Sequence, residues 1–463
     1  MIYYASENFI LKKEDGNLII YQYKKDREIL FENKYKDQLK LLKKEYLIKL
    51  REFCFNYRHK INSKKKIWFI SDSLNKAGDN GEYFFRYINE NKKKEINSYF
   101  IISQNSSDYK RLKIIGNVIP IESKEYTVKY LITDKIISSN FNPQIYNPFG
   151  KDEIYIYDLL HFDYIYLQNR INANNPSFNL LHKNFKILKF VTIASKKEYQ
   201  FFISKNYFHN KDNIKLTGFS RYDNLQRIKK TKKDEKFILI IPTGRISLKG
   251  TFDCSGYNPF FKNSQYFKFY NNLINNEKLL KAMDKFNYTG YFCLHQSLTS
   301  QYIDFCQNSQ IQIKDCSDIQ EILSNASLLV TDYSRVFFDF AYMEKPIIFT
   351  QFDLKEYYKN ENKQSYFDDT KDGFGPVYND IEKSINAIID SIENGCLLKK
   401  KYLRRIKKYF AYFDDKNSIR IFNEIIGISK TIYILHIIEK YIYYLEFIFI
   451  FFLSFFKYIH YYK

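Results

Sequence analysis

Cysteine and histidine are scarce in this sequence, and neither is grouped. The six cysteines form no CxxC pair, and none stands at metal-ligand spacing from any of the seven histidines; they are Cys54, Cys254, Cys293, Cys306, Cys316 and Cys396. This pattern argues against the common cysteine-histidine metal sites, and we predict neither a metal nor a cofactor. Scattered thiols in a chain of 463 residues indicate a reducing compartment.

The sequence also lacks a secretory signal and a long apolar run. The first residues, MIYYASENFILKKEDG, have neither the basic region nor the apolar stretch of a signal peptide. Residues 431–462 are dominated by Ile, Phe, Tyr and Leu, but their longest charge-free core, 447–456, has about half the length of a membrane span. We expect an aromatic membrane-associating tail, with a helix packed on the protein's own surface as the alternative. The prediction is a peripheral protein at the cytoplasmic face of the membrane.

Acidic residues are too few to balance the basic ones. The chain has 73 Lys and Arg against 52 Asp and Glu, a formal net charge of +21. Nucleic acid, an anionic membrane surface and a phosphate-rich substrate all fit such a charge. Lys, Asn, Ile, Tyr and Phe share A/T-rich codons, and all five are abundant, so charge alone selects no partner. Because the basic residues are dispersed and accompany no nucleic-acid-binding motif, we expect no nucleic acid.

Residues 1–63 are interpreted as an N-terminal accessory segment. Residues 17–23 and 28–32 flank a charged turn and are predicted to pair as a hairpin. Residues 39–57 carry apolar side chains at helical spacing, which is typical of a basic amphipathic helix.

Short apolar runs and helical patterns alternate through the rest of the chain, which predicts an α/β fold built from parallel βαβ units. The runs lie at 67–70, 99–102, 130–132, 164–167 and 190–194, then, after a charged linker at 229–236, at 237–241, 291–295, 328–331 and 346–350. We predict Rossmann-like domains at 64–230 and 236–412, a closing helix at 413–428 and the tail at 429–463. Ligands of such sheets bind beyond the carboxyl ends of the strands, so the site is expected between the two halves.

The segment 328–349 is the most informative one. An apolar strand runs into Thr331-Asp332-Tyr333-Ser334, and a helix is predicted to start near Arg335 with Ser334 as its N-cap. The first amides of a helix are free donors at the positive end of its dipole, so this start is a candidate phosphate site. The alternative is that Asp332 and Ser334 only cap the helix.

Three further groups follow predicted strands. Thr243-Gly244-Arg245 comes after 237–241, and an arginine there can fork onto a phosphate, although a surface role is favoured when this group is taken alone. His295 ends the strand at 291–295 and is either catalytic or structural. Asp79, Asn80 and Glu82 open a helix after the first strand, where they would line an acceptor site or only cap the helix.

Taken in order, eight stretches resemble the CDP-glycerol glycerophosphotransferase family, the polymerases and primases of teichoic-acid-like polymers. The stretches are IWFISDSLNKAGDNGEYFFRY (67–87), YLQNRINANNPSFN (166–179), VTIASKKEYQFF (191–202), LTGFSRYDNL (216–225), LIIPTGR (239–245), FCLHQSL (292–298), LVTDYSRVFFDFAYMEKPIIF (329–349) and YFDDKNSIRIFNEI (412–425). The stretch from TDYS to KPIIF is the most specific.

This resemblance implies a GT-B fold, in which two Rossmann-like domains face each other across a cleft and the second binds CDP-glycerol. The implied donor-binding residues are Thr243, Thr331, Asp332, Tyr333, Ser334, Arg335 and Asp339, with Arg245 and His295 on phosphate oxygens and Asp79, Asn80 and Glu82 on the acceptor side. An acceptor hydroxyl would attack the phosphorus next to glycerol, and CMP would leave. The implied partners are a CDP-activated polyol donor, a lipid-linked polymer acceptor and an anionic membrane surface.

The chain departs from the family pattern at its expected base. The family continues Leu167-Gln168 with His-Gly, whereas this chain has Asn169 and Arg170. Asparagine accepts no proton usefully at neutral pH. Either another group serves as base, or the acceptor differs, or catalysis is impaired; the other candidate bases are His161, Asp163 and His182.

Two other departures leave the substrate open. The PTGR stretch lacks the tryptophan that usually precedes its arginine, and Arg335 stands where the family often has a second serine. The alternatives are a CDP-ribitol ribitolphosphotransferase, a binding protein without turnover, and a GT-B glycosyltransferase that uses a nucleotide sugar. In the last case Asp339 or Asp353 would bind the donor ribose.

Overall fold

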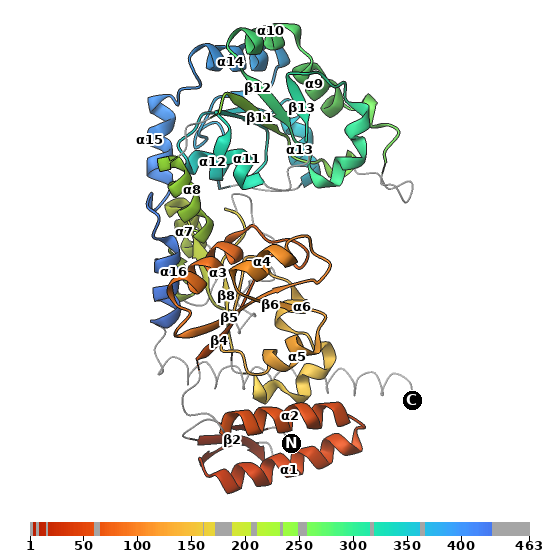
Figure 1. The fold of residues 1–463 in the computed structure, drawn as a ribbon, viewed down its shortest axis with the longest axis vertical. Helices are drawn as coiled ribbons and strands as arrows, with labels where there is room; N and C mark the ends of the chain where they lie inside the picture. The colour runs from red at the N-terminus through yellow and green to blue at the C-terminus, as the bar shows by residue number, and fades with distance from the viewer. Residues whose placement is uncertain are drawn as a thin grey trace. The chain divides into compact units, whose positions relative to one another are not determined.

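The structure is a computed structural model of the full chain (Figure 1). It describes residues 3–5, 9–14, 17–59, 65–160, 162–171, 188–204, 211–231, 235–248, 257–314, 319–361 and 366–427. The predicted tail at 429–463 and two candidate bases, His161 and His182, lie outside these ranges. Among the residues described, no helix combines the length and apolar character needed to cross a bilayer.

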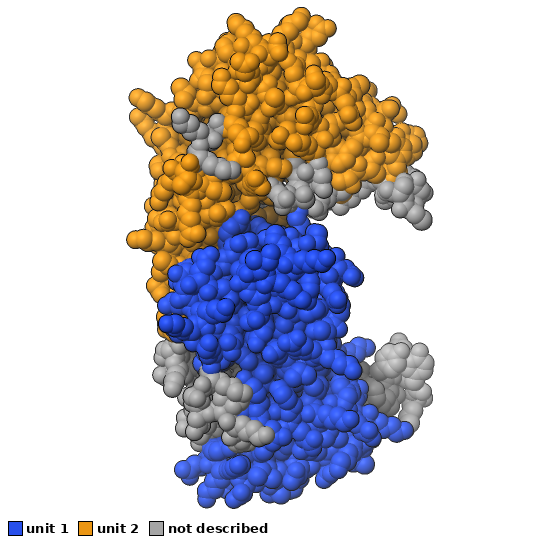
Figure 2. All heavy atoms as spheres, in the orientation of Figure 1, with its two compact units in different colours: residues 1–169, 186–191, 428–463 blue, residues 170–185, 192–427 orange. Residues whose placement is uncertain are grey.

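The chain divides into two compact units (Figure 2). Unit 1 contains residues 1–169, 186–191 and 428–463, and unit 2 contains 170–185 and 192–427. The predicted domain boundaries stay a prediction. Residues 192–230, which were predicted to end the first Rossmann-like domain, belong to unit 2.

Unit 1 begins with an antiparallel sheet and two helices. The strands are β1 (Tyr3–Ala5), β2 (Phe9–Glu14) and β3 (Asn17–Gln22), and the helices are α1 (Lys25–Leu41) and α2 (Glu45–His59). The predicted hairpin of 17–23 with 28–32 is wrong, because β3 pairs with β2 and residues 28–32 lie in α1. Phe31, Tyr35 and Leu39 recur every four residues and form the buried face of α1. The predicted helix 39–57 is interrupted at 42–44.

A buried ion cluster fixes these helices to the rest of unit 1. Arg51 of α2 is 0% exposed, and its Nη2 lies 2.8 Å from Glu32 Oε2 and 2.7 Å from Asp158 Oδ2. Its Nη1 also donates to the Tyr155 carbonyl oxygen at 3.1 Å. Burial opposes the charged form, but the two carboxylates outweigh it and raise the pKa of Arg51.

The larger sheet has seven strands in the order β10-β9-β8-β7-β4-β5-β6. They are β4 (Lys66–Ser71), β5 (Ile96–Ile102), β6 (Asn117–Pro120), β7 (Lys135–Ser138), β8 (Asp163–Tyr166), β9 (Leu188–Ile193) and β10 (Ile214–Leu216). The pairings from β6 through β9 are parallel. The helices before β9 are α3 (Asn80–Asn91), α4 (Tyr109–Ile115), α5 (Lys124–Tyr130), α6 (Pro143–Tyr146), η1 (Gly150–Tyr155) and η2 (Tyr157–Leu159).

One predicted strand of this sheet is misplaced. The run at 130–132 begins at the last residue of α5, whose Tyr126 and Tyr130 are buried one helical turn apart. The strand itself, β7, starts five residues after Tyr130, beyond Asp134, whose Oδ2 accepts the Ile67 N–H at 2.7 Å.

The sheet of unit 2 has six parallel strands in the order β13-β12-β11-β14-β15-β16. They are β11 (Phe237–Ile241), β12 (Thr289–Phe292), β13 (Ile311–Ile313), β14 (Leu328–Thr331), β15 (Ile347–Thr350) and β16 (Val377–Tyr378). Leu239 of β11 belongs to one buried core, and Ile238 and Ile240 belong to another. Both faces of the strand are therefore covered, which explains its unbroken apolar sequence.

The remaining helices follow in chain order. They are α7 (Lys196–Ser204), η4 (Lys211–Asn213), α8 (Ser220–Thr231), η5 (Ile246–Leu248), η6 (Phe261–Asn263), α9 (Gln265–Ile274), α10 (Glu277–Lys285), η7 (Gln296–Asp304), α11 (Ile319–Asn325), α12 (Phe337–Tyr342), α13 (Leu354–Glu361), α14 (Ile381–Glu393), α15 (Lys400–Tyr409) and α16 (Asn417–Ile426). The alternating α/β pattern expected from the sequence is confirmed as an α/β fold with two parallel sheets.

The cysteines differ from expectation at one position. Cys54, Cys306 and Cys396 are in the thiol form, but Cys293 is disulfide-bonded. The prediction that all six cysteines are scattered thiols is therefore wrong for Cys293.

Candidate functional site

The predicted donor-site residues converge at the carboxyl edge of the unit 2 sheet. Because β12, β11, β14 and β15 are neighbours and parallel, the segments that follow them meet at one edge. These segments hold Thr243-Gly244-Arg245, His295, the turn after Thr331, and Gln351 with Asp353. The site therefore combines residues more than a hundred positions apart.

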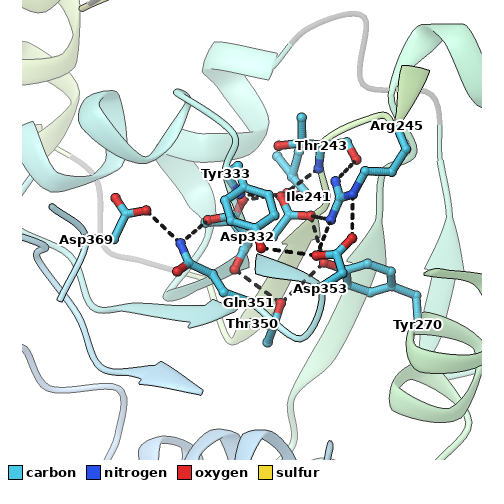
Figure 3. Close-up of polar contacts among 11 residues, drawn as sticks. Ile241, Thr243, Arg245, Tyr270, Asp332, Tyr333, Thr350, Gln351, Asp353 and Asp369 are labelled. Carbon is cyan, nitrogen blue, oxygen red and sulfur yellow. Dashed lines mark hydrogen bonds and ion pairs between the residues drawn. The ribbon is translucent and has the colours of Figure 1, made fainter. Parts of the chain in front are cut away.

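Asp332 is the centre of this edge (Figure 3). Its side chain is fully buried, and Oδ1 accepts the Thr243 N–H at 2.8 Å and also the Tyr333 N–H. Oδ2 lies 2.8 Å from Arg245 Nη2 and accepts the Tyr270 hydroxyl at 3.1 Å. One carboxylate thus joins the loop after β11, the turn after β14 and helix α9.

Arg245 is held by two carboxylates. Its Nε donates to Asp353 Oδ2 at 2.8 Å, its Nη2 donates to Asp332, and its Nη1 donates to the Thr243 carbonyl oxygen at 2.6 Å. Burial alone would lower the pKa of Arg245, but Asp332 and Asp353 raise it, so the guanidinium stays charged. Only 6% of Arg245 is exposed, so in this structure it positions the loop after β11.

Three tyrosine rings surround the same guanidinium. Its carbon lies 5.1 Å from the ring centre of Tyr266, 5.0 Å from Tyr333 and 5.1 Å from Tyr357. Tyr333 stacks on Tyr357 with ring centres 3.7 Å apart, and its hydroxyl donates to Asp353 Oδ1 at 3.1 Å. These contacts fix the Tyr333 ring, so its side chain is part of the scaffold.

His295 lies beside the loop after β11 and is exposed. Its Nδ1 accepts the Ser297 N–H at 3.2 Å and lies 2.9 Å from the Ser297 hydroxyl. An accepting Nδ1 places the hydrogen of a neutral imidazole on Nε2. A Cβ added at Gly244 would stand 3.0 Å from His295 Cγ and Nδ1. The loop therefore packs directly against the imidazole because residue 244 has no side chain.

The turn after Thr331 differs from the sequence prediction. Helix α12 begins at Phe337, two residues after Arg335, but Ser334 is not its N-cap; Val336 holds that position without a side-chain hydrogen bond. The Asp332 side chain takes the Tyr333 N–H, and residues 334–336 form a turn before the helix. Within the described residues, the backbone N–H groups of Ser334 and Val336 have no hydrogen-bond partner.

Two other predicted donor residues are engaged within the protein. The Thr331 hydroxyl donates to the Ile241 carbonyl oxygen at 2.6 Å and so fastens β14 to β11. Asp339 forms a two-point ion pair with Arg221 of α8, with both N–O distances 2.8 Å. Asp339 is 7% exposed, and it is not among the described residues that hydrogen-bond to Asp332.

Sequence reasoning missed Gln351 and Asp369. Gln351 Nε2 donates to Asp369 Oδ2 at 2.6 Å and to the Asp332 carbonyl oxygen at 3.3 Å. Asp369 is 9% exposed, and its Oδ1 has no hydrogen-bond partner among the described residues. Burial raises the pKa of Asp369, and the charge of Arg335 partly offsets this. Gln351 directly follows β15, so a search for polar residues after each predicted strand would have found it. Asp369 follows no predicted strand, and its sequence position therefore gives no such signal.

The predicted acceptor-side residues lie around a second buried aspartate, Asp72 of unit 1. Its carboxylate accepts the backbone N–H groups at the start of α3, from Asp79 at 3.0 Å, Gly81 at 2.7 Å and Glu82 at 3.1 Å. Burial raises the pKa of Asp72 to about 6, although these bonds oppose the shift. The helix start is thus already occupied by a carboxylate.

The side chains of Asn80 and Glu82 have separate partners. Asn80 Nδ2 donates to the Gln168 carbonyl oxygen at 2.8 Å. Glu82 forms ion pairs with Arg86 and Arg111, which together lower its pKa although burial opposes this. Asp79 caps α3 by accepting the Asn80 N–H at 2.7 Å.

Asn169 stands exposed directly after the segment that Asn80 holds. Gln168 before it is fully buried with φ +54°, a conformation rare outside glycine. Asp163, the other described candidate base, is buried and forms an ion pair with Lys135. In the described part of the chain, no three His, Cys, Asp or Glu side chains gather into a group able to hold a metal ion.

A family model and the curated relatives point to one family. The model of the CDP-glycerol:poly(glycerophosphate) glycerophosphotransferase family matches residues 52–427. The minor teichoic acid biosynthesis protein GgaB of Bacillus subtilis is 35% identical over 403 residues, which are 86% of this chain and 43% of GgaB. The chain therefore spans less than half of that relative. The teichoic acid ribitol-phosphate polymerase TarL of Staphylococcus aureus is 24% identical over 429 residues, 87% of this chain and 70% of TarL.

A solved structure shows the same fold. The wall teichoic acid polymerase TagF superposes with a TM-score of 0.55 and 16% identity, covering 86% of this chain and 99% of that one. At this identity the likeness concerns the fold alone. The sequence match covers most of the chain, including both Asn169 and the edge built on Asp332. The chain belongs to the CDP-glycerol:poly(glycerophosphate) glycerophosphotransferase family.

Proposed function

We propose that this protein transfers glycerol phosphate, or a related polyol phosphate, from a CDP-activated donor to a teichoic-acid-like or capsular polymer. The observation that carries the proposal is the family match over residues 52–427, which contains the connected edge of Asp332, Arg245 and His295. The polymerases TarL and TagF and a TagF variant soaked with CDPG support the same class of donor.

The proposed reaction is a phosphoryl transfer. An acceptor hydroxyl oxygen forms a bond to the phosphorus that carries glycerol, the bond from this phosphorus to the bridging oxygen breaks, and CMP leaves with the electron pair. Such a transfer needs positioning and charge stabilisation more than covalent chemistry. His295 Nε2–H and the N–H groups of Ser334 and Val336 are the proposed donors to phosphate oxygens, and Arg335 is the proposed nearby cation.

Arg245 acts indirectly in this proposal. Its nitrogens are occupied by Asp332, Asp353 and the Thr243 carbonyl oxygen, so it fixes the loop that contacts His295. Removing one donor aimed at the transition state typically costs about 3 kcal/mol. Loss of the His295 imidazole is therefore expected to slow turnover by about a hundredfold.

The finer fold is proposed to be the GT-B arrangement of two Rossmann-like domains with a cleft, and the acceptor side is proposed to lie on unit 1. Asp79, Asn80 and Glu82 then shape the acceptor side, and Asn80 holds the segment that carries Asn169. Because Asn169 replaces the base of the family pattern, the proton of the acceptor hydroxyl goes to another group or turnover is slow. An impaired enzyme is the alternative that this substitution favours.

The test is direct. Purified protein is incubated with CDP-glycerol and a lipid-linked glycerol phosphate primer, and CMP release is followed. CDP-ribitol is the second donor, because the relatives include a ribitol-phosphate polymerase and a glycerol-phosphate polymerase. Release of CMP from either donor supports the proposal, and release of a nucleoside diphosphate from a nucleotide sugar would replace it. No release from any donor, with binding retained, would indicate the impaired enzyme.

The proposed place of action is the cytoplasmic face of the membrane, with peripheral attachment. The corner between α1 and α2 exposes Leu41 by 84%, Leu42 by 51% and Tyr46 by 47%, beside Lys40 and Lys43. Apolar side chains among lysines fit an anionic bilayer surface.

Vesicle binding tests this attachment. We expect Leu41→Glu with Leu42→Glu to reduce co-flotation with phosphatidylglycerol vesicles. Ile114→Glu is the control, since Ile114 is 88% exposed on another element of unit 1. Equal loss in both variants would contradict a role for this corner.

A further inference from the structure

Helix α15 has an unusual charge distribution. Its sequence, KKYLRRIKKY, contains six cations and no carboxylate. Tyr402, Ile406 and Tyr409 are its buried residues. With 3.6 residues per turn, the opposite side of the helix is a separate face. That exposed face consists of Lys400, Lys401, Arg404, Lys407 and Lys408.

Most of this positive charge is not compensated. Lys407 forms an ion pair with Glu344. Within the described residues, none of the other four cations of the exposed face lies within ion-pair distance of a carboxylate; they are Lys400, Lys401, Arg404 and Lys408. We call these four residues the basic track.

Another exposed helix of unit 2 shows that this imbalance is local. On α10, Lys278 lies 3.5 Å from Glu382, and Lys281 lies 3.6 Å from Glu277. Both helices belong to the same lysine-rich chain, but α10 pairs two of its three lysines with carboxylates, whereas α15, among the residues that the structure describes, pairs only Lys407 of its six cations. The A/T-rich codon bias that enriches lysine everywhere therefore does not explain the basic track.

The helix that carries the track is attached to the candidate site. Arg405, on the inner side of α15, donates through Nη1 to the carbonyl oxygens of Gly373 at 2.8 Å and Thr370 at 3.3 Å. This loop contains Asp369, which is bonded to Gln351 at the site edge. The track, the loop and the site belong to unit 2.

We propose that the basic track binds the polyanionic polymer that the proposed reaction extends; this inference rests on the proposed function. A polyol phosphate polymer carries one negative charge in each repeat. Lys400, Arg404 and Lys408 are four residues apart, so successive cations lie about 6 Å apart along the helix axis. Long flexible cations neutralise such phosphates one by one without reading a sequence.

The composition of the exposed face favours a polymer over a bilayer. Helices that lie in a membrane interface present large apolar side chains together with their lysines. On α15 the exposed side chains are all cationic, and its tyrosines and Ile406 point into the core. A dissolved polyanion needs only the charges.

The test compares two variants with the same change in net charge. The track variant is Lys400→Gln, Arg404→Gln, Lys408→Gln, and the control is Lys278→Gln, Lys281→Gln, Lys285→Gln on α10. Binding of the full chain to poly(glycerol phosphate) of defined length is measured over a range of salt concentrations without any donor. We expect the track variant to bind about tenfold more weakly, with a salt slope smaller by about two, and the control to resemble the wild type.

Three outcomes would overturn the inference. They are an unchanged salt slope in the track variant, an equal loss in the control, and a loss of binding to phosphatidylglycerol vesicles without a loss of polymer binding. The last outcome would assign the track to the membrane. Circular dichroism confirms that each variant is folded. Because no donor is present, a failure of CMP release in the wild type would reject the proposed function without affecting this measurement.

Discussion

Replacing Asp332 by asparagine tests whether one carboxylate holds the site edge together. The substitution keeps the shape of the side chain and its Oδ1, which accepts two backbone N–H groups. In place of Oδ2 it puts an NH₂ group, which faces Arg245 Nη2 at 2.8 Å and the Tyr270 hydroxyl at 3.1 Å. The Tyr270 hydroxyl can rotate and accept a hydrogen bond from the new NH₂ group, but the Arg245 guanidinium has only donors and cannot accept one. Asp332→Asn therefore sets two donors against each other in a fully buried place.

The size of the effect follows from what remains. Breaking a buried ion pair by removing one partner costs about 3–5 kcal/mol. Asp353 stays bonded to Arg245 in the variant, so we expect the lower end, about 3 kcal/mol of the free energy of unfolding. The matched control is Asp372→Asn, because Asp372 pairs with Lys197 in the same unit but is 28% exposed. A surface pair of this kind contributes at most about 1 kcal/mol.

Urea denaturation measures both variants with two signals. The only tryptophan, Trp68, lies in β4 of unit 1, so its fluorescence follows that unit, while circular dichroism follows the whole chain. For Asp332→Asn we expect the circular dichroism midpoint to fall further than the fluorescence midpoint. The apparent KM for the donor should also rise, because the Thr243–Arg245 loop is no longer fixed against His295. A loss below about 1 kcal/mol, or equal to that of the control, would refute the role given to Asp332.

Three further predictions concern single positions. Asn169→His should raise CMP release by about a hundredfold if this position takes the acceptor proton, since a placed base contributes at least that factor; an unchanged rate would place the base elsewhere. Gly244→Ala should push the His295 ring aside and lower kcat/KM by about tenfold at a stability cost of about 1–2 kcal/mol, so a loss of stability without a change in kcat/KM would contradict the contact. Glu82 has a lowered pKa, so it stabilises the fold above pH 4.5 and this contribution disappears as the pH falls through its folded-state pKa. The difference in urea stability between wild type and Glu82→Gln should therefore shrink below pH 4.5, and a difference that grows would reverse the assignment.

The central strands of unit 2 could be predicted because their sequence pattern is local. The runs at 237–241 and 328–331 coincide with β11 and β14, since strands covered on both faces are apolar throughout. The error at 28–32 has an equally local cause. That run fits a strand or a helix, and only burial of Phe31 together with Tyr35 decides for the helix.

The details of the site could not be predicted because its decisive contacts are distant in sequence. Ser334 has the composition of an N-cap, but Asp332 takes the Tyr333 N–H and delays the helix to Phe337. The partners that hold Asp332 there include Thr243, which is 89 positions away. The candidate site residues could be identified because they follow predicted strands. That several of them hydrogen-bond to one another becomes visible only in the fold.

The path of the chain through β9 limits how this protein can be dissected. Residues 188–191 of that strand belong to unit 1, and Thr192 and Ile193 belong to unit 2. A stop codon or a protease site placed at this junction would cut an internal strand of the seven-stranded sheet. Both fragments would then expose backbone N–H and C=O groups that are hydrogen-bonded in the intact sheet. Fragments expressed on either side of residue 191 are therefore poor stand-ins for the two units, and each unit is better studied by point substitution in the intact polypeptide.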